Sequence, residues 1–548
     1  MPVKAVALAL AVLTLAAGCV APGATTPQTP LDDLLSPVLY EGVLAEHAPI
    51  ESFDGTVLDA WVFRPDVGDG GEAVPVIINF SPYWSNLSPP AATGGDAFSQ
   101  HLIEYFVPRG YAVALVSARG TGLSEGCFTI GGPIELQDED VVATFFGTQP
   151  WSNGNVTATG KSYDGTMAQG LLTRSNPHVR TIVPVSPISE LYKYTYFDGV
   201  PYTNFNFNTY YVEMVSIAQG QDTWDKTPTR FCDESAEVQA SQYHSFLTGD
   251  YSPYWQARNY TALLPDTVEA SVFYIHGLAD WNVKPDHMTP WLEELYARNV
   301  TVKQWLGQWA HDYPTRPDFN QTLLRWLDHY LKGVDTGILQ EPLVQVEDSE
   351  GLWRHEDEWP PARATPLVRH LDAQGRLSEA PGTGAGTYPD RPALHGAPVP
   401  QMLLYSFDAP EDLRIVGAPL LHVAVSSTGP RATLSATLLA GDAVIGQGFR
   451  DLAHRDSLAQ SQPMAPGQVY EVDVHFYPQD VVVKKGTRLT LVVAHAPAGD
   501  APVGILALPT SALVTVHHEP SWLRLPVVPA ADVTPEPVQP EDVGCWAC

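Results

Sequence analysis

Apolar runs and amphipathic stretches alternate along the chain from about residue 40 to residue 185. The runs at 74–79 and 111–117 are almost continuously apolar, which is typical of strands buried on both faces of a sheet. Stretches at 100–109 and 135–147 have helical spacing, and the second begins with acidic residues, which suit a helix N-terminus. Further strands are predicted at 56–64, 156–159 and 181–185. Strands that alternate with helices predict a mostly parallel, doubly wound α/β sheet.

The pattern changes twice after residue 185. Between 186 and 267, aromatic residues crowd among asparagine and threonine, which favours a largely helical cap. Its aromatic rings either form the roof of a pocket or pack the cap's own core. The sheet pattern resumes with strands at 271–276 and 300–306, and a helix at 321–331 ends at a Lys-Gly stop. Beyond 341, short alternating strands predict a β-sandwich of the jelly-roll type, with strands at 420–426, 432–439, 470–476 and 488–493.

The most informative segment is Gly-Lys-Ser-Tyr-Asp-Gly at 160–165. A β-prone run precedes it and a plausible helix at 166–172 follows it. Strand, sharp serine turn and helix form the context of the nucleophile elbow in an α/β-hydrolase. Such a turn exposes the Ser162 hydroxyl at the carboxyl edge of the sheet, beside a helix N-terminus that favours developing negative charge. We therefore predict Ser162 as a nucleophile rather than as part of an ordinary glycine-rich turn.

A second serine stands in a stricter copy of the same pattern. Gly-Leu-Ser-Glu-Gly at 122–126 has the strict Gly-x-Ser-x-Gly spacing. In the motif around Ser162, the glycine that follows the serine stands at 165, one place later than this spacing requires. The strict copy lies several residues beyond its strand, and the residues after it have no helical period and end in chain breakers. We therefore predict that Ser124 lies in a loop.

The elbow and the change of pattern together predict five parts. An α/β-hydrolase domain comprises residues 38–185 and 268–340, with the cap inserted at 186–267 and the jelly-roll sandwich at 341–525. Residues 1–37 are predicted as a signal peptide with a lipoprotein-type tether, and residues 526–548 as a proline-rich tail.

A serine nucleophile needs a base within hydrogen-bond reach and an acid that orients the base. In this fold the chain order is serine, acid, histidine. Asp280 follows a buried strand and a glycine turn, so we favour it over Asp286, which fits the start of a helix. His311 follows the next strand in the same way, so we favour it over His276 and His287 as the base.

The oxyanion of the reaction needs two donors. The first is expected to be the backbone N–H of Tyr163, the residue after the nucleophile. The second should come from the loop after the strand at 74–79, which has no glycine pair but offers the phenolic hydroxyl of Tyr83. The alternative is that Tyr83 is a packed surface aromatic.

Charge limits the partners. The chain has 548 residues and a formal net charge of -32, from 30 basic and 62 acidic residues. This balance argues against nucleic acid and anionic membrane surfaces as partners.

The N-terminus predicts export. A single lysine precedes an uncharged, mostly apolar run, and Leu-Ala-Ala-Gly-Cys at 15–19 ends it like a bacterial-type lipobox. The run is too short for a stable transmembrane helix. We expect lipidation at Cys19 and anchoring at the outer face of the cell membrane, with simple secretion as the alternative.

Five cysteines remain informative in an exported chain. With Cys19 used for lipid, Cys127 can pair with Cys232, and Cys545 with Cys548; the alternative is that Cys127 and Cys232 are free and buried. Sequence alone does not decide the connectivity. The terminal Cys-Trp-Ala-Cys has no second cysteine pair nearby, so a redox or zinc role is not expected.

Several motifs together resemble the family of Xaa-Pro dipeptidyl-peptidases and cocaine-esterase-type acyl hydrolases. The resemblance covers roughly residues 40–525. The motifs that carry it are Ser-Pro-Tyr at 81–83, Arg-Gly-Thr-Gly-Leu-Ser-Glu-Gly at 119–126, Trp-Ser-Asn-Gly at 151–154, Gly-Lys-Ser-Tyr at 160–163, Tyr-Ser-Pro-Tyr-Trp at 251–255, His-Gly-Leu-Ala-Asp-Trp-Asn-Val at 276–283 and Tyr-Pro-Gln-Asp-Val at 477–481.

This resemblance implies an α/β-hydrolase with a helical cap and a C-terminal jelly roll. It also implies Ser162, Asp280 and His311 as the triad, with Tyr83 and the Tyr163 amide as oxyanion donors. Within the family, the elbow and the segment after Asp280 are similar to the peptidase branch. A dipeptidyl-peptidase also needs carboxylates for the substrate's free ammonium, and Glu190 and Asp198 at the start of the cap are candidates; the alternative is a solvated cap face.

The resulting hypothesis is an exported serine hydrolase that works through an acyl-enzyme and needs no metal or cofactor. The expected substrate is a peptide with proline second from a free N-terminus. An esterase or acylase acting on small acyl esters or amides is the alternative with the same chemistry. An inactive surface protein whose jelly roll binds carbohydrate is the alternative of another class.

Overall fold

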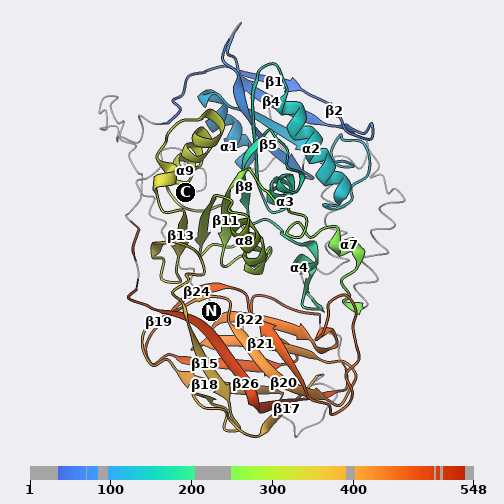
Figure 1. Cartoon of the computed structure of the whole chain (residues 1–548), viewed down its shortest axis with the longest axis vertical. Helices are drawn as coiled ribbons and strands as arrows, with labels where there is room; N and C mark the ends of the chain where they lie inside the picture. The colour runs from blue at the N-terminus through green and yellow to red at the C-terminus, as the bar shows by residue number, and fades with distance from the viewer. Residues whose placement is uncertain are drawn as a thin grey trace, which may run out of the picture.

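The computed structural model describes residues 35–68, 71–83, 97–203, 248–390, 401–498, 501–506, 510–532 and 534–536. An α/β half and an all-β half lie end to end along the long axis of the molecule (Figure 1). The short elements of the cap, α4 (Leu191–Thr195) and α7 (Pro253–Gln256), lie beside the junction of the two halves.

A ten-stranded sheet organises the α/β half. Its strand order is β1-β4-β6-β5-β7-β8-β11-β12-β13-β14, and every pair from β6 to β13 is parallel. The strands are β1 (Val43–His47), β4 (Ala60–Pro65), β5 (Val74–Ser81), β6 (Ala112–Ser117), β7 (Ser152–Lys161), β8 (Val179–Val185), β11 (Ser271–Gly277), β12 (Val302–Gly307), β13 (Val344–Glu347) and β14 (Trp353–Glu356). The strand predicted at 56–64 is divided between β4 and β3 (Val57–Leu58), and β3 pairs with β2 (Ile50–Glu51).

Helices cover both faces of this sheet, because alternate residues of each parallel strand point to opposite sides. Ala112 and Ala114 of β6 belong to one hydrophobic core, whereas Val113 and Leu115 belong to the other. The first core is shared with α2 (Pro133–Gly147), α3 (Tyr163–Gly170) and α8 (Met288–Ala297). The second is shared with α1 (Ala97–Phe106) and α9 (Phe319–Leu327). Short helical turns complete this half: η2 (Val107–Arg109), η3 (Leu171–Arg174), η4 (Pro285–His287), η5 (Asp328–Lys332) and η6 (Ile338–Gln340). The predicted doubly wound α/β sheet is therefore confirmed.

The described part of the cap is built around stacked aromatic rings. Tyr192 stacks on Tyr196 at 4.8 Å between ring centroids, and both meet the edge of Trp255. All three side chains are buried. A short hairpin of β9 (Tyr196–Phe197) and β10 (Val200–Pro201) follows α4. Residues 204–247 of the predicted cap lie outside the described residues.

Two antiparallel sheets form the all-β half and enclose one apolar core. The larger sheet contains β15 (Thr365–Leu371), β16 (Leu377–Ser378), β17 (Ala385–Pro389), β19 (Leu413–Gly417), β20 (Leu420–Ser427), β23 (Tyr470–His475), β24 (Gln479–Val483) and β26 (Leu513–Pro529). The smaller sheet contains β18 (Met402–Asp408), β21 (Thr433–Ala440), β22 (Ala443–Asp451) and β25 (Arg488–Ala494), and η8 (Leu452–His454) follows β22. The predicted β-sandwich is confirmed, including the four strands predicted in it.

Two strands after the predicted boundary at 341 join the sheet of the α/β half. β13 and β14 belong to the ten-stranded sheet rather than to the sandwich. β13 runs parallel to β12, and β14 closes the edge as an antiparallel partner of β13. A short antiparallel edge strand has the same alternating pattern as a sandwich strand, so the pattern alone could not assign it.

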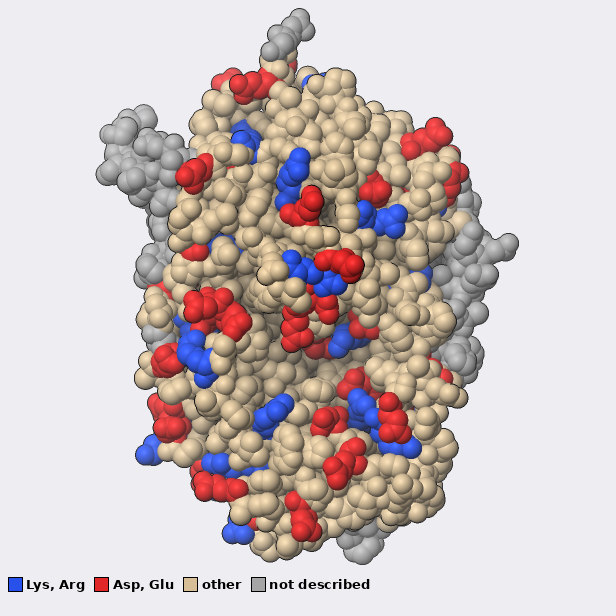
Figure 2. All heavy atoms as spheres, in the orientation of Figure 1, with Lys and Arg blue, Asp and Glu red and all other residues tan. Residues whose placement is uncertain are grey.

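The surface carries both signs of charge. On the face drawn in Figure 2, acidic and basic side chains are interspersed over both halves, with wide uncharged areas between them. Among the described residues, no helix has both the length and the apolar character that a membrane crossing requires.

Candidate active site

Ser162 sits at a sharp turn between β7 and α3. Its backbone has φ 65° and ψ −124°, a left-handed φ that a residue with a side chain rarely adopts. The Ser162 N–H donates to the Val185 carbonyl at 3.0 Å, which fixes the turn against β8. The side chain is half-buried. The strand, strained serine and helix predicted from the sequence are therefore present.

The late glycine of this elbow has a steric explanation. A Cβ atom at Gly160 would lie 2.4 Å from the Cβ of Asp164, and one at Gly165 would lie 2.7 Å from the Val185 carbonyl oxygen. The turn therefore needs glycine at 160 and 165, while position 164 accommodates a buried aspartate. Close approach of the strand and helix, rather than the spacing of the motif, decides where the glycines stand.

Ser124, in the strict copy of the motif, has a different environment. It lies outside any helix or strand, as predicted. Its hydroxyl donates to the Ser117 carbonyl at 2.8 Å and accepts from the Asp59 N–H at 2.8 Å. Both bonds hold the loop to neighbouring strands, so the hydroxyl has a structural role.

Asp280 and His311 are brought together by the loops after β11 and β12. Asp280 is fully buried, and its Oδ2 lies 2.7 Å from His311 Nδ1. Its Oδ1 accepts the N–H groups of Asn282 and Val283, each at 2.9 Å. These bonds fix the carboxylate and occupy Nδ1, so Nε2 is the nitrogen of His311 that is left to act as a base.

The rival candidates have structural partners. His276 is buried, with Nε2 2.9 Å from the Val283 carbonyl and Nδ1 3.2 Å from the Tyr274 hydroxyl. His287 is also buried, and its Nδ1 lies 3.3 Å from the Ser189 N–H nitrogen. Burial lowers the pKa of His276 and holds the pKa of His287 well below its usual range, so both rings are weaker bases than an exposed imidazole.

The register of the sheet places the three predicted residues at one edge. β7, β8, β11 and β12 are neighbours, with Lys161 opposite Val185 and Gly277 opposite Gly307. The carboxyl ends of these strands are therefore level. Lys161 Nζ lies 3.3 Å from Asp312 Oδ1 and 3.5 Å from the His311 carbonyl oxygen, so the elbow touches the loop that carries the histidine.

Tyr83 lies where the strand order of the sheet reverses. β5 has β6 on one side and β7 on the other, and ligands of open α/β sheets bind at such a switch point. Ile78 is paired with Ala158, so the end of β5 is level with the end of β7, and Tyr83 follows two residues later. Its half-buried ring packs against the core under the elbow. The register thus brings the ends of β5 and β7, which lead into Tyr83 and Ser162, to the same edge of the sheet.

Tyr163 provides the first backbone N–H of α3. Its side chain is anchored by Glu135, which was not among the predicted site residues. The Tyr163 hydroxyl donates to Glu135 Oε2 at 2.6 Å. The same buried carboxylate accepts the Thr129 N–H, the Thr129 hydroxyl and the Gly131 N–H at 2.7, 2.8 and 3.0 Å. From the sequence, Glu135 was explained as an acidic residue that suits the N-terminus of α2. The helical pattern did not show that its side chain is fully buried.

Glu190 and Asp198, the candidate carboxylates for a substrate amine, line one pocket of about 120 Å³. Asp286 lines it as well, with Lys193 Nζ 4.0 Å from its Oδ2. Asp198 also pairs with Arg450 of the sandwich at 3.0 Å. Burial raises the pKa of Glu190 and of Asp286. Tyr192 and Tyr196 line this pocket, and they belong to the core shared with α2, α3 and α8 rather than to a separate core of the cap.

Of the cysteines, Cys127 is disulfide-bonded. This overturns the alternative that it is free. The predicted partner Cys232, together with Cys19, Cys545 and Cys548, lies outside the described residues.

Two sequence models match the chain in succession. Residues 54–313 match the X-Pro dipeptidyl-peptidase (S15 family), and residues 336–510 match the X-Pro dipeptidyl-peptidase C-terminal non-catalytic domain. The chain belongs to the X-Pro dipeptidyl-peptidase S15 family. As a member of this serine peptidase family, the protein is a serine hydrolase, and the predicted resemblance is confirmed.

Curated relatives of this S15 family member match over most of its length. A candidate Xaa-Pro dipeptidyl-peptidase of Bacillus cereus is 29% identical over 488 residues, which cover 79% of this chain and 81% of the relative. One of Streptomyces avermitilis is 28% identical over 569 residues, which cover 84% and 82%.

Solved structures show the same fold. A CocE/NonD family hydrolase from Staphylococcus aureus superposes with a TM-score of 0.73 at 16% identity, covering 89% of this chain and 94% of that one. An α-amino acid ester hydrolase superposes with a TM-score of 0.67 at 18% identity, covering 92% and 100%. The predicted α/β-hydrolase with a C-terminal sandwich is confirmed.

Proposed function

We propose that this protein is an Xaa-Pro dipeptidyl-peptidase in which Ser162, His311 and Asp280 form the catalytic triad. The observation that carries this proposal is the 2.7 Å bond between His311 and Asp280 at the edge of the sheet where strained Ser162 begins α3. The Ser162–Asp280–His311 order along the chain is the one this fold uses.

The reaction follows from these positions. Ser162 Oγ attacks the carbonyl carbon of the substrate while His311 Nε2 takes the proton of the Ser162 hydroxyl. Asp280 accepts the bond from His311 Nδ1–H and stabilises the imidazolium. The Tyr163 N–H and the Tyr83 hydroxyl donate to the oxyanion, and the first of them is aided by the dipole of α3. His311 then protonates the leaving amine and later activates the water that hydrolyses the acyl-enzyme.

The acidic pocket supports a substrate with a free N-terminus. Glu190, Asp198 and Asp286 bring three carboxylates to it, against Lys193 beside Asp286 and Arg450 beside Asp198, so the balance favours a cation. The helix α4, which contributes Tyr192 and Lys193 to the pocket, also contacts the loop of the proposed acid, because Tyr194 donates to Asn282 at 2.7 Å. The small volume of the pocket suits an ammonium group rather than a whole dipeptide. We propose that Glu190 and Asp198 bind the substrate's ammonium, with Asp286 beside them.

The test compares three substrates: an Xaa-Pro anilide, its N-acetylated form and a simple aryl ester. We expect efficient cleavage of the free-amine anilide, and a KM for it that rises about tenfold in Glu190→Gln with little change for the ester. A preference for the ester without any preference for proline would favour the esterase or acylase and remove the peptidase assignment. Equal KM values for free and acetylated anilides would remove the amine site alone.

We also propose that the chain is exported and lipid-anchored at Cys19, as its N-terminal sequence predicts. One acyl group gives weak membrane binding, so stable anchoring implies more than one chain on this cysteine. Expression in a bacterial host should place the native chain in the membrane fraction and Cys19→Ser in the soluble fraction. Equal partition of both would favour simple secretion.

A further inference from the structure

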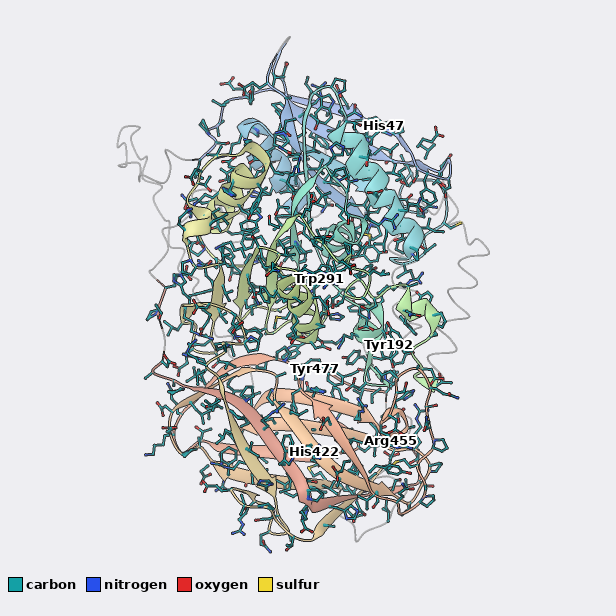
Figure 3. The ribbon with its side chains drawn as sticks, viewed as in Figure 1. His47, Tyr192, Trp291, His422, Arg455 and Tyr477 are labelled. Carbon is teal, nitrogen blue, oxygen red and sulfur yellow. The ribbon has the colours of Figure 1, made fainter. Side chains whose placement is uncertain are left out.

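The motif at 477–481 in the sandwich domain has no role in the chemistry described above. It includes the start of β24, the strand that lies at the end of the sandwich facing the α/β half (Figure 1). Tyr477 lies at the junction of the two halves (Figure 3). Tyr477, Gln479 and Asp480 are all buried. A buried polar segment at a domain junction needs partners, and these partners lie on the loops of the proposed triad.

The first contact is with the loop of the acid. Gln479 Nε2 donates to the Leu278 carbonyl at 3.2 Å, two residues before Asp280. The Tyr477 ring meets the edge of Trp281, the residue after Asp280, at 5.9 Å between centroids. Asp280 is therefore held from both sides by one segment of the other domain.

The second contact is with the loop of the base. Gln308 precedes His311 by three residues, and its Nε2 donates to the Asp480 carbonyl at 3.3 Å. The same side-chain nitrogen donates to the Glu347 carbonyl at 3.0 Å, and the Gln308 N–H donates to Glu347 Oε2 at 2.7 Å. The base loop is thus tied both to β13 and to the sandwich.

The segment is itself rigidly fixed. Arg354 of β14 binds both oxygens of the Asp480 carboxylate, with Nη1 3.0 Å from Oδ1. Trp359 Nε1 donates to Asp480 Oδ2 at 3.0 Å. Tyr477 donates to the Tyr202 hydroxyl of the cap at 2.8 Å. A buried, multiply bonded ion pair of this kind contributes defined geometry more than net stability.

We propose that Gln479 is a positioning residue for the catalytic acid and base, so that the sandwich domain sets the geometry of the Asp280–His311 pair. The two loops leave the sheet on neighbouring strands, and β24 spans both of them. The Leu278 N–H donates to the Gly307 carbonyl at 2.7 Å and the Ala279 N–H to the Trp309 carbonyl at 3.2 Å, so the two loops are also joined directly. Removing the Gln479 bond therefore shifts the acid loop without detaching it, and displacements of about 1 Å in such groups are costly for the chemical step. This proposal rests on the proposed triad, although not on which substrate the enzyme takes.

The test uses the full chain with Gln479→Met, which keeps the length of the side chain and removes its donor. The matched control is Gln447→Met. Gln447 is also buried in the sandwich, but its side chain exchanges bonds of 3.0 and 3.1 Å with Val503 and none with either triad loop. Its backbone carbonyl accepts the Tyr477 N–H at 3.0 Å, and the substitution keeps that bond. We expect kcat of Gln479→Met to fall about tenfold with KM within about twofold, and the acid limb of its pH profile to shift, while Gln447→Met keeps the native profile.

Gln308→Met reports on the same network from the base loop and serves if Gln479→Met does not fold. It should reproduce the loss of kcat and the shifted profile. A lowered Tm in Gln479→Met with native kcat and a native pH profile would overturn the proposal, and so would an equal loss of kcat in Gln447→Met.

The controls separate this result from the proposed function. The ratio of variant to native kcat should be the same for the anilide and the aryl ester, so an incorrect substrate leaves the result intact. If Ser162→Ala retains activity, the triad assignment itself fails, whatever Gln479→Met shows.

Discussion

Two regions of the α/β half contain the same chemical groups and differ in what the backbone does with them. Around Ser124, a Gly-x-Ser-x-Gly motif lies beside Asp59, and Asp59 Oδ1 is 2.7 Å from His47 Nε2. Around Ser162, the His311–Asp280 contact has the same length. Serine, histidine and a buried aspartate are therefore present in both places.

The difference lies in how each hydroxyl is held. Ser124 has both a donor and an acceptor on the backbone of neighbouring strands, and no helix follows it. Ser162 has a strained φ and begins α3 at the carboxyl edge. His47 lies on β1 at the outer edge of the sheet, about half exposed (48%), far from the junction of the halves (Figure 3). Both serines lie near the carboxyl ends of strands, so the strained turn that leads into a helix is what distinguishes the candidate site.

Exchanging the two serines for alanine should give the largest contrast. Ser162→Ala should lower kcat by about 10⁴-fold or more and abolish labelling by a fluorophosphonate, because the nucleophile is lost. Ser124→Ala should keep native labelling and cost about 1–2 kcal/mol in the free energy of unfolding, since two backbone hydrogen bonds are lost. Fluorophosphonate labelling measures whether each variant retains the nucleophile, and chemical denaturation measures its free energy of unfolding. Labelling of Ser162→Ala at the native rate would contradict the comparison.

The two aspartates provide the next contrast. Asp280→Asn should lower kcat by about 10³–10⁴-fold with the fold retained, because the amide cannot stabilise the His311 imidazolium. Asp59→Asn changes an equally short histidine contact outside the site and should leave kcat within about twofold. Steady-state kinetics, with circular dichroism as a check on folding, decide this. A comparable loss of kcat in both variants would contradict this, because it would show that any short aspartate–histidine contact matters for activity, wherever it lies.

Tyr83→Phe should lower kcat by about 10²-fold with little change in KM, because the variant lacks the hydroxyl proposed to donate to the oxyanion. The control is Tyr163→Phe, whose hydroxyl binds Glu135 while its N–H is the proposed donor. That variant should lose stability more than kcat. A Tyr83→Phe enzyme with native kcat would leave Tyr83 as a packed aromatic.

Substituting one glycine near each serine tests which of the two turns activity depends on. Gly160→Ala places a Cβ 2.4 Å from that of Asp164, so we expect about 1–3 kcal/mol of destabilisation and an approximately tenfold loss of kcat. Gly126 has φ 80° in the loop of Ser124, so Gly126→Ala should cost a similar 1–3 kcal/mol in stability with native kcat. Thermal unfolding and kinetics on both variants test this. Native kcat in Gly160→Ala would show that the elbow tolerates the displacement.

The smallest expected effect is a dependence of KM on pH. Burial raises the pKa of Asp59 and of Glu190, but only Glu190 lines the proposed amine pocket. As the pH falls through the raised pKa, Glu190 becomes neutral and attracts the substrate's ammonium less. KM for the free-amine anilide should therefore rise a few-fold towards acid pH. It should stay constant for the aryl ester, and Asp59→Asn should not alter either profile.

Much of the fold was readable from the sequence because its periodicities are local. Continuous apolar runs marked the buried strands β5, β6 and β11, and alternation marked the sandwich strands. The elbow was predictable because strand, serine turn and helix are consecutive in the chain. The sequence did not show that β13 and β14 pair with the α/β sheet, since the pattern of a short strand does not encode which sheet it joins.

The site was predictable only in its order along the chain. Ser162, Asp280 and His311 were each proposed from a position just beyond a strand, and the same reasoning could not reveal Glu135 or Lys161. Glu135 looks like any acid in the first turn of a helix until four donors are found around its buried carboxylate. Lys161 looks like a solvated lysine until the loop of His311 folds against it.

The sequence by itself determined which strands are buried, where the serine turn lies and in what order the reactive groups follow. Tertiary structure alone decided how the histidine and aspartate of each grouping come together, and which sandwich residues hold the loops of the acid and the base. The physical reason is that periodicity and turn chemistry act between neighbours in the chain. Convergence of Asp280, His311 and Gln479 depends on sheet register and on contacts between residues up to 201 positions apart.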